Sequence, residues 1–169
     1  MIIELTQGYQ AIVDDEDYDK ISHLTWRVNI IRRHNCRPQI TAIASLPRQK
    51  GVKRKTVSMH RVLMEALHGD ITGKIIDHID HNKLNNSKSN LRFATRQQNS
   101  ANMRKKNGNS SSQYKGVCYV GYKNKPWRMT IKVNGKAQTK CFATEIEAAK
   151  EYNKRAVKAF GEFAYLNSF

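Results

Sequence analysis

The pattern of apolar and polar residues predicts several short strands in the first half of the chain. They fall at residues 11–13, 26–31, 39–46 and 56–59. Apolar residues then recur at helical spacing from residue 62 to residue 67, and Gly69 supplies a C-terminal stop. Asp15 is expected to cap a short helix that runs to Ile21. We therefore expect a small β-rich platform with Trp26 in its core, followed by one helix.

Two short apolar segments and a helix start follow, at residues 74–78, 91–95 and 95–99. A loop of Asn, Asp, Lys and Ser joins the two segments. Thr95, with Gln98 three residues later, forms a capping box that starts the helix. This layout places Asp77 and His78 at the end of one strand, facing the first turn of the helix that carries Asn99. An acid, an imidazole and an amide that converge can bind a divalent cation and activate a water beside it.

A second pattern begins at residue 114. Strands are expected at residues 114–120, 127–133 and 136–142, with Asn134-Gly135 as a type I′ hairpin turn. Thr144 and Glu147 form another capping box, and the helix that follows has an apolar stripe that should cover one face of the sheet. The open face is expected to carry the polar residues of the last two strands, which are Arg128, Thr130, Lys132, Lys136, Gln138 and Lys140.

Charge indicates the kind of partner. The 169 residues carry a formal net charge of +16 and have a pI of about 10, which favours a polyanion such as nucleic acid. The cations gather in residues 31–60 and again after residue 100, and residues 103–112 are expected to form a basic flexible linker. Three cysteines without close pairing argue against a disulfide scaffold and against a Cys-x-x-Cys zinc site. No segment approaches membrane-spanning length, so we expect a soluble, cytoplasmic protein without a membrane partner.

The segment from His60 to Asn99 resembles the HNH nuclease motif, the ββα-metal fold, in the variant found in phage and intron homing endonucleases. The matching residues are His60-Arg61-Val62-Leu63, Asp77-His78-Ile79-Asp80, Asn85-Asn86, Asn90-Leu91-Arg92 and Asn99. The resemblance implies that His78 is the general base and that Asn90 orients it. The position of His60 and Arg61 at a strand-to-helix junction suits contact with the scissile phosphate, and a structural hydrogen bond is an equal alternative for His60. The resemblance also implies a divalent ion on Asp77 and Asn99, Mg²⁺ in the first place, with Mn²⁺ as a substitute. His81 stands where the family often has Gly, and a loop-structural role is favoured over a third ligand or a phosphate contact.

Residues 113–169 resemble the DNA-binding domain of the plant Apetala-two and ethylene-response-factor family, which also occurs in phage homing endonucleases. The match includes Tyr114-Lys115-Gly116-Val117, Trp127-Arg128, Phe142-Ala143-Thr144-Glu145 and Ala164-Tyr165-Leu166-Asn167. The resemblance implies DNA contacts from the sheet. Here these would come from Lys115, Arg128, Thr130, Lys132, Lys136, Gln138 and Lys140. Several of the family's arginines are absent, so we expect anchoring on the DNA backbone rather than the family's base preference.

Together these patterns predict an α+β protein. The HNH nuclease domain is expected at residues 1–102, with its core motif at 56–102, then the linker at 103–112 and the DNA-binding domain at 113–169. The expected function is metal-dependent hydrolysis of phosphodiester bonds in duplex DNA, by a monomer or a DNA-induced dimer, without a small-molecule cofactor. A non-catalytic, sequence-specific DNA-binding regulator and a basic RNA-binding protein stay open as alternatives. The four residues Asp77, His78, Asn90 and Asn99 favour the nuclease, because a regulator has no need of them.

Overall fold

A computed structural model describes residues 1–32, 34, 37–47, 51, 55–105 and 110–169 of the chain. Part of the predicted basic stretch at 31–60, the cysteine at 36 and the middle of the predicted linker therefore lie outside the described residues. The chain forms two compact units, Met1–Ala94 and Thr95–Phe169.

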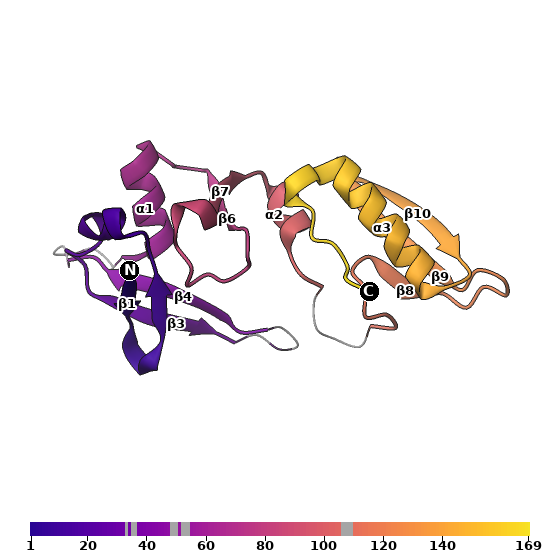
Figure 1. Ribbon diagram of the computed structural model, residues 1–169, viewed down its shortest axis with the longest axis horizontal. Coiled ribbons are helices and arrows are strands. Elements are labelled where there is room, and N and C mark those ends of the chain that lie inside the picture. The colour runs from indigo at the N-terminus through magenta and orange to yellow at the C-terminus, as the bar shows by residue number, and fades with distance from the viewer. Residues whose placement is uncertain (33, 35–36, 48–50, 52–54, 106–109) are drawn as a thin grey trace. The chain divides into compact units, whose positions relative to one another are not determined.

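The first unit consists of short antiparallel strands and one α-helix (Figure 1). The described residues of this unit form three sheets, β1–β2, β3–β4–β5 and β6–β7. The elements are β1 (Ile2–Glu4), η1 (Thr6–Gly8), β2 (Gln10–Ile12), η2 (Asp15–Lys20), β3 (Trp26–Ile31), β4 (Gln39–Ser45), β5 (Thr56–Ser58), α1 (Met59–His68), β6 (Ile75–His78), η3 (Lys88–Asn90) and β7 (Leu91–Ala94). The predicted strands are confirmed to within about a residue. Helix α1 begins at Met59, so His60 and Arg61 lie in its first turn rather than before it.

The core of the first unit gathers apolar residues from β2, β3, β4 and α1. Trp26 is buried there as predicted, and its indole Nε1 donates to the Ile21 carbonyl at 3.0 Å. The short helix after residue 14 is a 3-10 helix, and its N-cap is Asp14 rather than Asp15. The Asp14 carboxylate does not cap this helix, because it accepts a hydrogen bond from the Lys88 backbone N–H at 2.7 Å. The prediction of Asp15 as the cap is wrong because Asp14 is the residue with extended backbone before the helix.

The second unit contains a three-stranded antiparallel sheet in the order β10–β9–β8 and two helices. Its elements are α2 (Arg96–Asn102), β8 (Val117–Tyr119), β9 (Trp127–Val133), β10 (Lys136–Phe142), α3 (Glu145–Phe160) and η4 (Gly161–Phe163). Both predicted capping boxes are present, at Thr95 and at Thr144. Asn134 and Gly135 have φ values of 49° and 79°, the positive pair that a type I′ turn needs.

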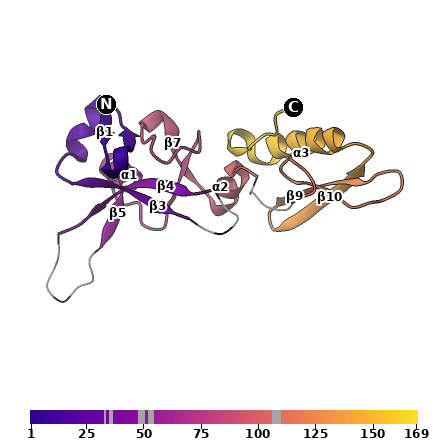
Figure 2. The ribbon, with the colours of Figure 1, turned by 90° about the horizontal axis from the view of Figure 1, so that it is seen from below.

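Helix α3 covers one face of this sheet (Figure 2). The apolar face of β9, with Met129 and Ile131, packs on Ala149 and Tyr152 of the helix. Gly116, just before β8, has φ +75°, and a Cβ there would lie 2.2 Å from the Tyr152 ring. Only glycine therefore allows the chain to pass this close to α3.

The register of β9 and β10 corrects one prediction about the open face. Lys136 lies opposite Val133, and Gln138 and Lys140 lie opposite Ile131 and Met129. Directly opposed residues share a face in an antiparallel sheet, so these three side chains are on the helix side. In agreement, the Arg155 guanidinium of α3 donates to Gln138 Oε1 at 3.5 Å. The prediction that they share the face of Arg128, Thr130 and Lys132 is wrong, because a two-residue turn reverses the parity of the numbering.

Helix α2 belongs to the second unit, which differs from the predicted domain boundary at residue 102. The Tyr165 backbone N–H donates to the Ala101 carbonyl at 3.1 Å, and Ala101 and Asn102 are buried. The described residues at the two ends of the predicted linker are also joined by a hydrogen bond. Lys105 Nζ donates to Ser110 Oγ at 2.6 Å and to the Tyr114 carbonyl at 3.2 Å. The last helix of the HNH-like pattern thus folds with the C-terminal unit.

Candidate active site

His78 ends strand β6 and is 6% exposed. Its Nε2 lies 3.5 Å from the amide oxygen Oδ1 of Asn86. The Asn86 amide nitrogen donates elsewhere, to the Leu84 carbonyl at 3.1 Å and to Met59 Sδ at 3.4 Å. With its oxygen toward the ring, Asn86 favours the tautomer that carries the proton on Nε2, because an amide oxygen can only accept. The lone pair of His78 is then on Nδ1.

Asn86 is itself held by the N-terminal strand β2. The Asn86 N–H donates to the Ile12 carbonyl at 2.7 Å, and the Ile12 N–H donates to the Leu84 carbonyl at 2.8 Å. The loop residue Lys88 is tied to the same segment through the Asp14 carboxylate and through an ion pair with Glu16 at 2.5 Å. The acidic N-terminal segment therefore fixes the loop that presents Asn86 to His78.

His60 and His78 lie together, with ring centroids 5.1 Å apart and ring planes at 80°. The Ser58 hydroxyl is 3.3 Å from His60 Nε2. Burial lowers the pKa of His60 to about 3, and the nearby His78, Lys83 and Arg61 charges add to this. Burial also lowers the pKa of His78; the Asn86 hydrogen bond opposes the shift and Lys83 reinforces it. Both imidazoles are consequently neutral near pH 7.

Asp77 precedes His78 and is also 6% exposed. It lies opposite Arg92 in the β6–β7 pair, and the Arg92 guanidinium donates to Asp77 Oδ2 through Nε at 3.1 Å and Nη2 at 3.0 Å. Burial of a carboxylate is costly unless it is paired and hydrogen-bonded, and the two Arg92 donors meet both needs. The short β6–β7 ladder thus supplies an anionic oxygen donor, fixed in orientation, next to a neutral imidazole.

Asn90 stabilises the loop that follows His78 rather than its ring. Its carbonyl accepts from the Ile79 N–H at 3.0 Å, and its side-chain oxygen accepts from the Asp80 N–H at 2.9 Å. The Asn90 amide donates to Asp80 Oδ1 at 2.9 Å and to the Asn85 carbonyl at 2.8 Å. Burial opposes ionisation of Asp80, but hydrogen bonds from Asn85, Asn82 and Asn90 outweigh it and lower the pKa of Asp80. Asn90 therefore acts on the backbone at the end of β6, while Asn86 makes the side-chain contact with His78.

His81 has a φ of 65° in this loop, and its N–H donates to the His78 carbonyl at 3.1 Å. A left-handed backbone favours glycine, which accounts for the glycine that the resembling family often has there. The structure thus supports the loop-structural interpretation of His81.

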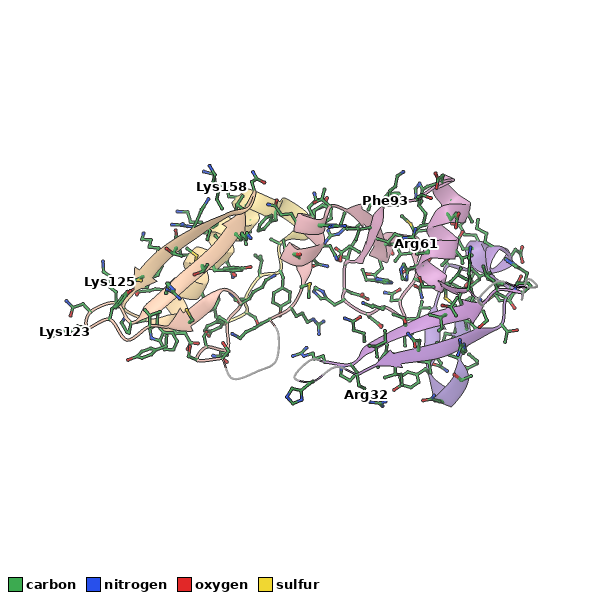
Figure 3. The ribbon with its side chains drawn as sticks, turned by 180° about the vertical axis from the view of Figure 1, so that it is seen from behind. Arg32, Arg61, Phe93, Lys123, Lys125 and Lys158 are labelled. Atoms are coloured by element: carbon green, nitrogen blue, oxygen red, sulfur yellow. The ribbon has the colours of Figure 1, made fainter. Side chains whose placement is uncertain are left out.

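Two cations expected to touch DNA are bonded to backbone carbonyls. Arg61 donates to the carbonyls of Lys74 and Ile71, both at 3.3 Å (Figure 3). Lys115 donates to carbonyls at the end of α2, at 2.5 Å to Ala101 and 2.6 Å to Met103. These bonds give both residues a structural task, and their contact with DNA stays a prediction.

The structure brings His60, Asp77, His78 and Asn90 together in the first unit. Asn99 lies on α2 in the second unit, where its N–H donates to the Thr95 carbonyl at 2.9 Å. Its pairing with Asp77 around a metal therefore stays a prediction. Among the described residues, no group of three or more His, Cys, Asp or Glu side chains is placed to hold a metal ion.

On the sheet of the second unit, Arg128 and Lys132 are exposed and Thr130 is half-buried, all three on the face opposite α3. Lys136, Gln138 and Lys140 are exposed on the strand at the edge of the sheet, on the helix side. The DNA-binding roles of these six residues stay predictions. Only Arg128, Thr130 and Lys132 of the six lie on the open face.

Two residues near His78 were missed by sequence reasoning. Asn86 was noted only as a part of the motif, and its task depends on β2, more than seventy residues earlier in the sequence. Lys83, whose ammonium donates to Gln39 Oε1 at 3.3 Å, helps to lower the pKa values of both His60 and His78. For Lys83, the signal in the sequence was a lysine inside an Asn-rich loop close to His78.

The match to known proteins agrees with this geometry. The model of a family described as HNH endonuclease matches residues 57–101. The chain carries an HNH endonuclease domain. The predicted recognition of an HNH nuclease is thereby confirmed, whereas the Apetala-two-like assignment of the C-terminal unit stays a prediction. The matched residues run from β5 through α1 and the β6–β7 pair into α2. The HNH domain thus includes every residue from His60 to Asn99 discussed above.

The chain is also similar to two viral proteins, the first of which is named as an HNH endonuclease. An uncharacterized HNH endonuclease of Acanthamoeba polyphaga mimivirus is 42% identical over 117 residues, which is 66% of this chain and 57% of the relative. Protein 3.8 of Escherichia phage T7 is 39% identical over 83 residues, which is 48% of this chain and 67% of that protein. The chain therefore spans little more than half of the mimivirus relative. No solved structure matches the chain significantly. Within the part of the chain that the structure describes, no helix is both long and apolar enough to cross a membrane.

Proposed function

We propose that this protein is a metal-dependent endonuclease of the homing type that hydrolyses phosphodiester bonds in duplex DNA. The observation that carries the proposal is His78 at the end of β6 in an HNH domain, buried, neutral near pH 7 and held by Asn86. A general base must be deprotonated at the working pH and fixed in orientation, and both conditions are met here.

His78 takes a proton from the attacking water through Nδ1. Asn86 holds the proton on Nε2, so that the other ring nitrogen accepts. Asn90 fixes the backbone that follows His78. The neutral His60 ring makes a T-shaped contact with the His78 ring. When the water attacks phosphorus, its O–H bond breaks toward His78, a new P–O bond forms, and the bond to the leaving oxygen breaks. The leaving oxygen departs with the electron pair and takes a proton from solvent. His78 in its protonated form then has Lys83 as a like-charged neighbour, which favours release of the proton.

Asp77 and Asn99 are the residues that would hold a divalent metal. A carboxylate and an amide are hard oxygen donors, which suit Mg²⁺ and leave positions for water and phosphate oxygens. A bound metal of this kind neutralises charge on the phosphate and on the leaving oxygen. Arg92 keeps the Asp77 side chain in one orientation for this purpose.

The C-terminal unit would anchor the enzyme on DNA through the open face of its sheet. Arg128 and Lys132 are exposed on that face, and the chain has a net charge of +16. Phosphate contacts from such cations supply affinity that falls steeply with salt. A single HNH site cuts one strand, so cleavage of both strands requires a second molecule or a second binding event.

The test is nicking of supercoiled plasmid that contains the chain's own genomic locus, with Mg²⁺ and with excess chelator. We expect nicks with Mg²⁺ or Mn²⁺ and none with chelator. We also expect His78→Ala to lose activity by about 10²- to 10⁴-fold, with DNA affinity within a few fold of wild type. The matched control is His68→Ala, which changes an exposed histidine at the end of α1.

The outcomes separate the proposal from its alternatives. Tight duplex binding by wild type without any metal-dependent cleavage would support the non-catalytic regulator. Preference for RNA over duplex DNA in competition would support the RNA-binding protein. Equal activity of His78→Ala and wild type would remove His78 from the mechanism.

A further inference from the structure

The end of helix α2 is held by one lysine of the C-terminal unit. Lys115 Nζ donates to the carbonyls of Ser100, Ala101 and Met103, at 3.4, 2.5 and 2.6 Å. The ammonium also lies 5.6 Å from the centre of the Tyr165 ring, whose backbone N–H donates to the same Ala101 carbonyl. The last carbonyls of a helix have no partner within the helix, and they carry its negative dipole end. Lys115 satisfies both the hydrogen bonds and the charge.

The backbone of Lys115 is fixed from the far end of the chain. Asn167, which is 8% exposed, accepts from the Lys115 N–H at 2.7 Å and donates to its carbonyl at 3.2 Å. Asn153 of α3 in turn bonds both the N–H and the carbonyl of Asn167, at 2.8 Å each. Gly116 follows, packed on Tyr152. A continuous set of hydrogen bonds thus leads from α3 through Asn167 to Lys115 and then to α2.

Helix α2 needs such support because it is short. It has seven residues, and isolated helices of this length are not stable in water. The capping box at Thr95 secures its first turn, and Lys115 with Tyr165 secures its last. Burial lowers the pKa of Lys115 to about 8.

We infer that Lys115 is a positioning residue of the nuclease: by capping α2 it fixes the helix that carries Asn99. The consequence for the reaction rests on the proposed function, in which Asn99 holds the metal. The capping of α2 itself does not rest on it. The sequence-based alternative, in which Lys115 contacts phosphate, makes different predictions for the same variant.

The experiment compares Lys115→Met with Lys158→Met in the full chain. Lys158 is exposed on α3, and its substitution by methionine removes the same charge (Figure 3). Methionine keeps the aliphatic stem but loses the ammonium. We measure cleavage rate at saturating DNA, KM for DNA, the Mg²⁺ concentration for half-maximal rate, and amide hydrogen exchange of residues 99–103. Lys115→Arg, which keeps cationic donors, serves as the conservative rescue.

For Lys115→Met we expect kcat to fall by about tenfold or more, as for other residues that support a metal ligand. The half-maximal Mg²⁺ concentration should rise, the amides of residues 100–103 should exchange faster, and KM for DNA should stay within about twofold of the value for Lys158→Met. Lys115→Arg should recover part of the rate. If Lys115→Met is too unstable to purify, Lys115→Gln, which also removes the ammonium, takes its place, and faster exchange at residues 100–103 in that variant than in Lys158→Met decides the capping.

Two results would overturn the inference. One is a raised KM with a salt slope reduced by about 0.9 and an unchanged kcat, which is the signature of a lost phosphate contact. The other is unchanged exchange at residues 100–103. If wild type does not cleave DNA at all, the proposed function fails, while the exchange measurement still tests whether Lys115 holds α2.

Discussion

The two units hold their polar residues in opposite ways. Around His78 in the first unit, polar side chains are buried and bonded to one another, including Asp77, Asn86 and Asn90. On the open sheet of the second unit, Arg128 and Lys132 are exposed, each as a separate cation. Removal of one buried residue leaves its partner unsatisfied, whereas exposed cations act nearly independently. We therefore expect large, non-additive effects in the first unit and smaller, additive effects in the second.

The sharpest test of the buried network is Asn86→Ala. Without the amide oxygen, His78 is no longer held in the tautomer that leaves Nδ1 free of a proton. We expect kcat to fall by roughly ten- to a hundredfold, part of what a positioned base contributes, while KM for DNA stays close to wild type. Single-turnover cleavage separates the two quantities. An unchanged kcat would mean that Asn86 only supports the loop.

The exposed sheet is tested by two double variants of equal charge. Arg128→Met with Lys132→Met removes cations from the open face, and Lys136→Met with Lys140→Met removes cations on the helix side. The first pair should lower the slope of log affinity against log salt by about 1.8, or 0.9 for each phosphate contact. The second pair should lower it by less. Equal slopes for the two would show that the face of the sheet does not determine DNA contact.

The first unit should also lose stability in acid. The pKa of His60 is lowered by burial to about 3, so between pH 6.5 and 3 the unfolded state binds a proton that the folded state does not. Above pH 6.5 this proton binding costs the folded state nothing, and the free energy of unfolding falls as the pH is lowered from 6.5 towards 3. At pH 5.5 the loss of stability amounts to about 1.4 kcal/mol for one such histidine. Chemical denaturation at pH 7.5 and pH 5.5 measures the loss, which should be smaller in His60→Gln.

The smallest effect concerns the loop after β6. His81→Gly places the residue best suited to φ 65° at that position. We expect a gain in the free energy of unfolding of no more than about 1 kcal/mol, because added freedom of the unfolded chain offsets part of the relief. Cleavage activity should be retained. A clear loss of cleavage would instead indicate that His81 binds phosphate or metal.

Local signals in the sequence predicted the elements well. The capping boxes at Thr95 and Thr144 and the Asn134-Gly135 turn depend on residues within three positions of one another, and all three are present. The error in the face of β10 was avoidable, because a two-residue turn at 134–135 already places Lys136 opposite Val133. Counting the register through the turn would have corrected it.

The contacts that complete the site were not predictable in this way. The order of His60, Asp77, His78 and Asn90 along the chain indicated the motif. The contacts of Asn86 with β2 and of Lys115 with α2 depend on how distant segments pack. A lysine in a basic protein is expected to face a polyanion, and only tertiary structure shows that Lys115 is used on carbonyls instead. The same holds for Arg61.

The link between β2 and the loop at Asn86 has a consequence for how the protein acquires activity during synthesis. Ile12 leaves the ribosome more than seventy residues before its partners Leu84 and Asn86, which follow most of the first unit. Pairing over such a long stretch of chain is slow to form compared with local helices. A nascent chain can therefore fold α1 before it orients His78. His78 is thus oriented only after most of the first unit has been synthesised.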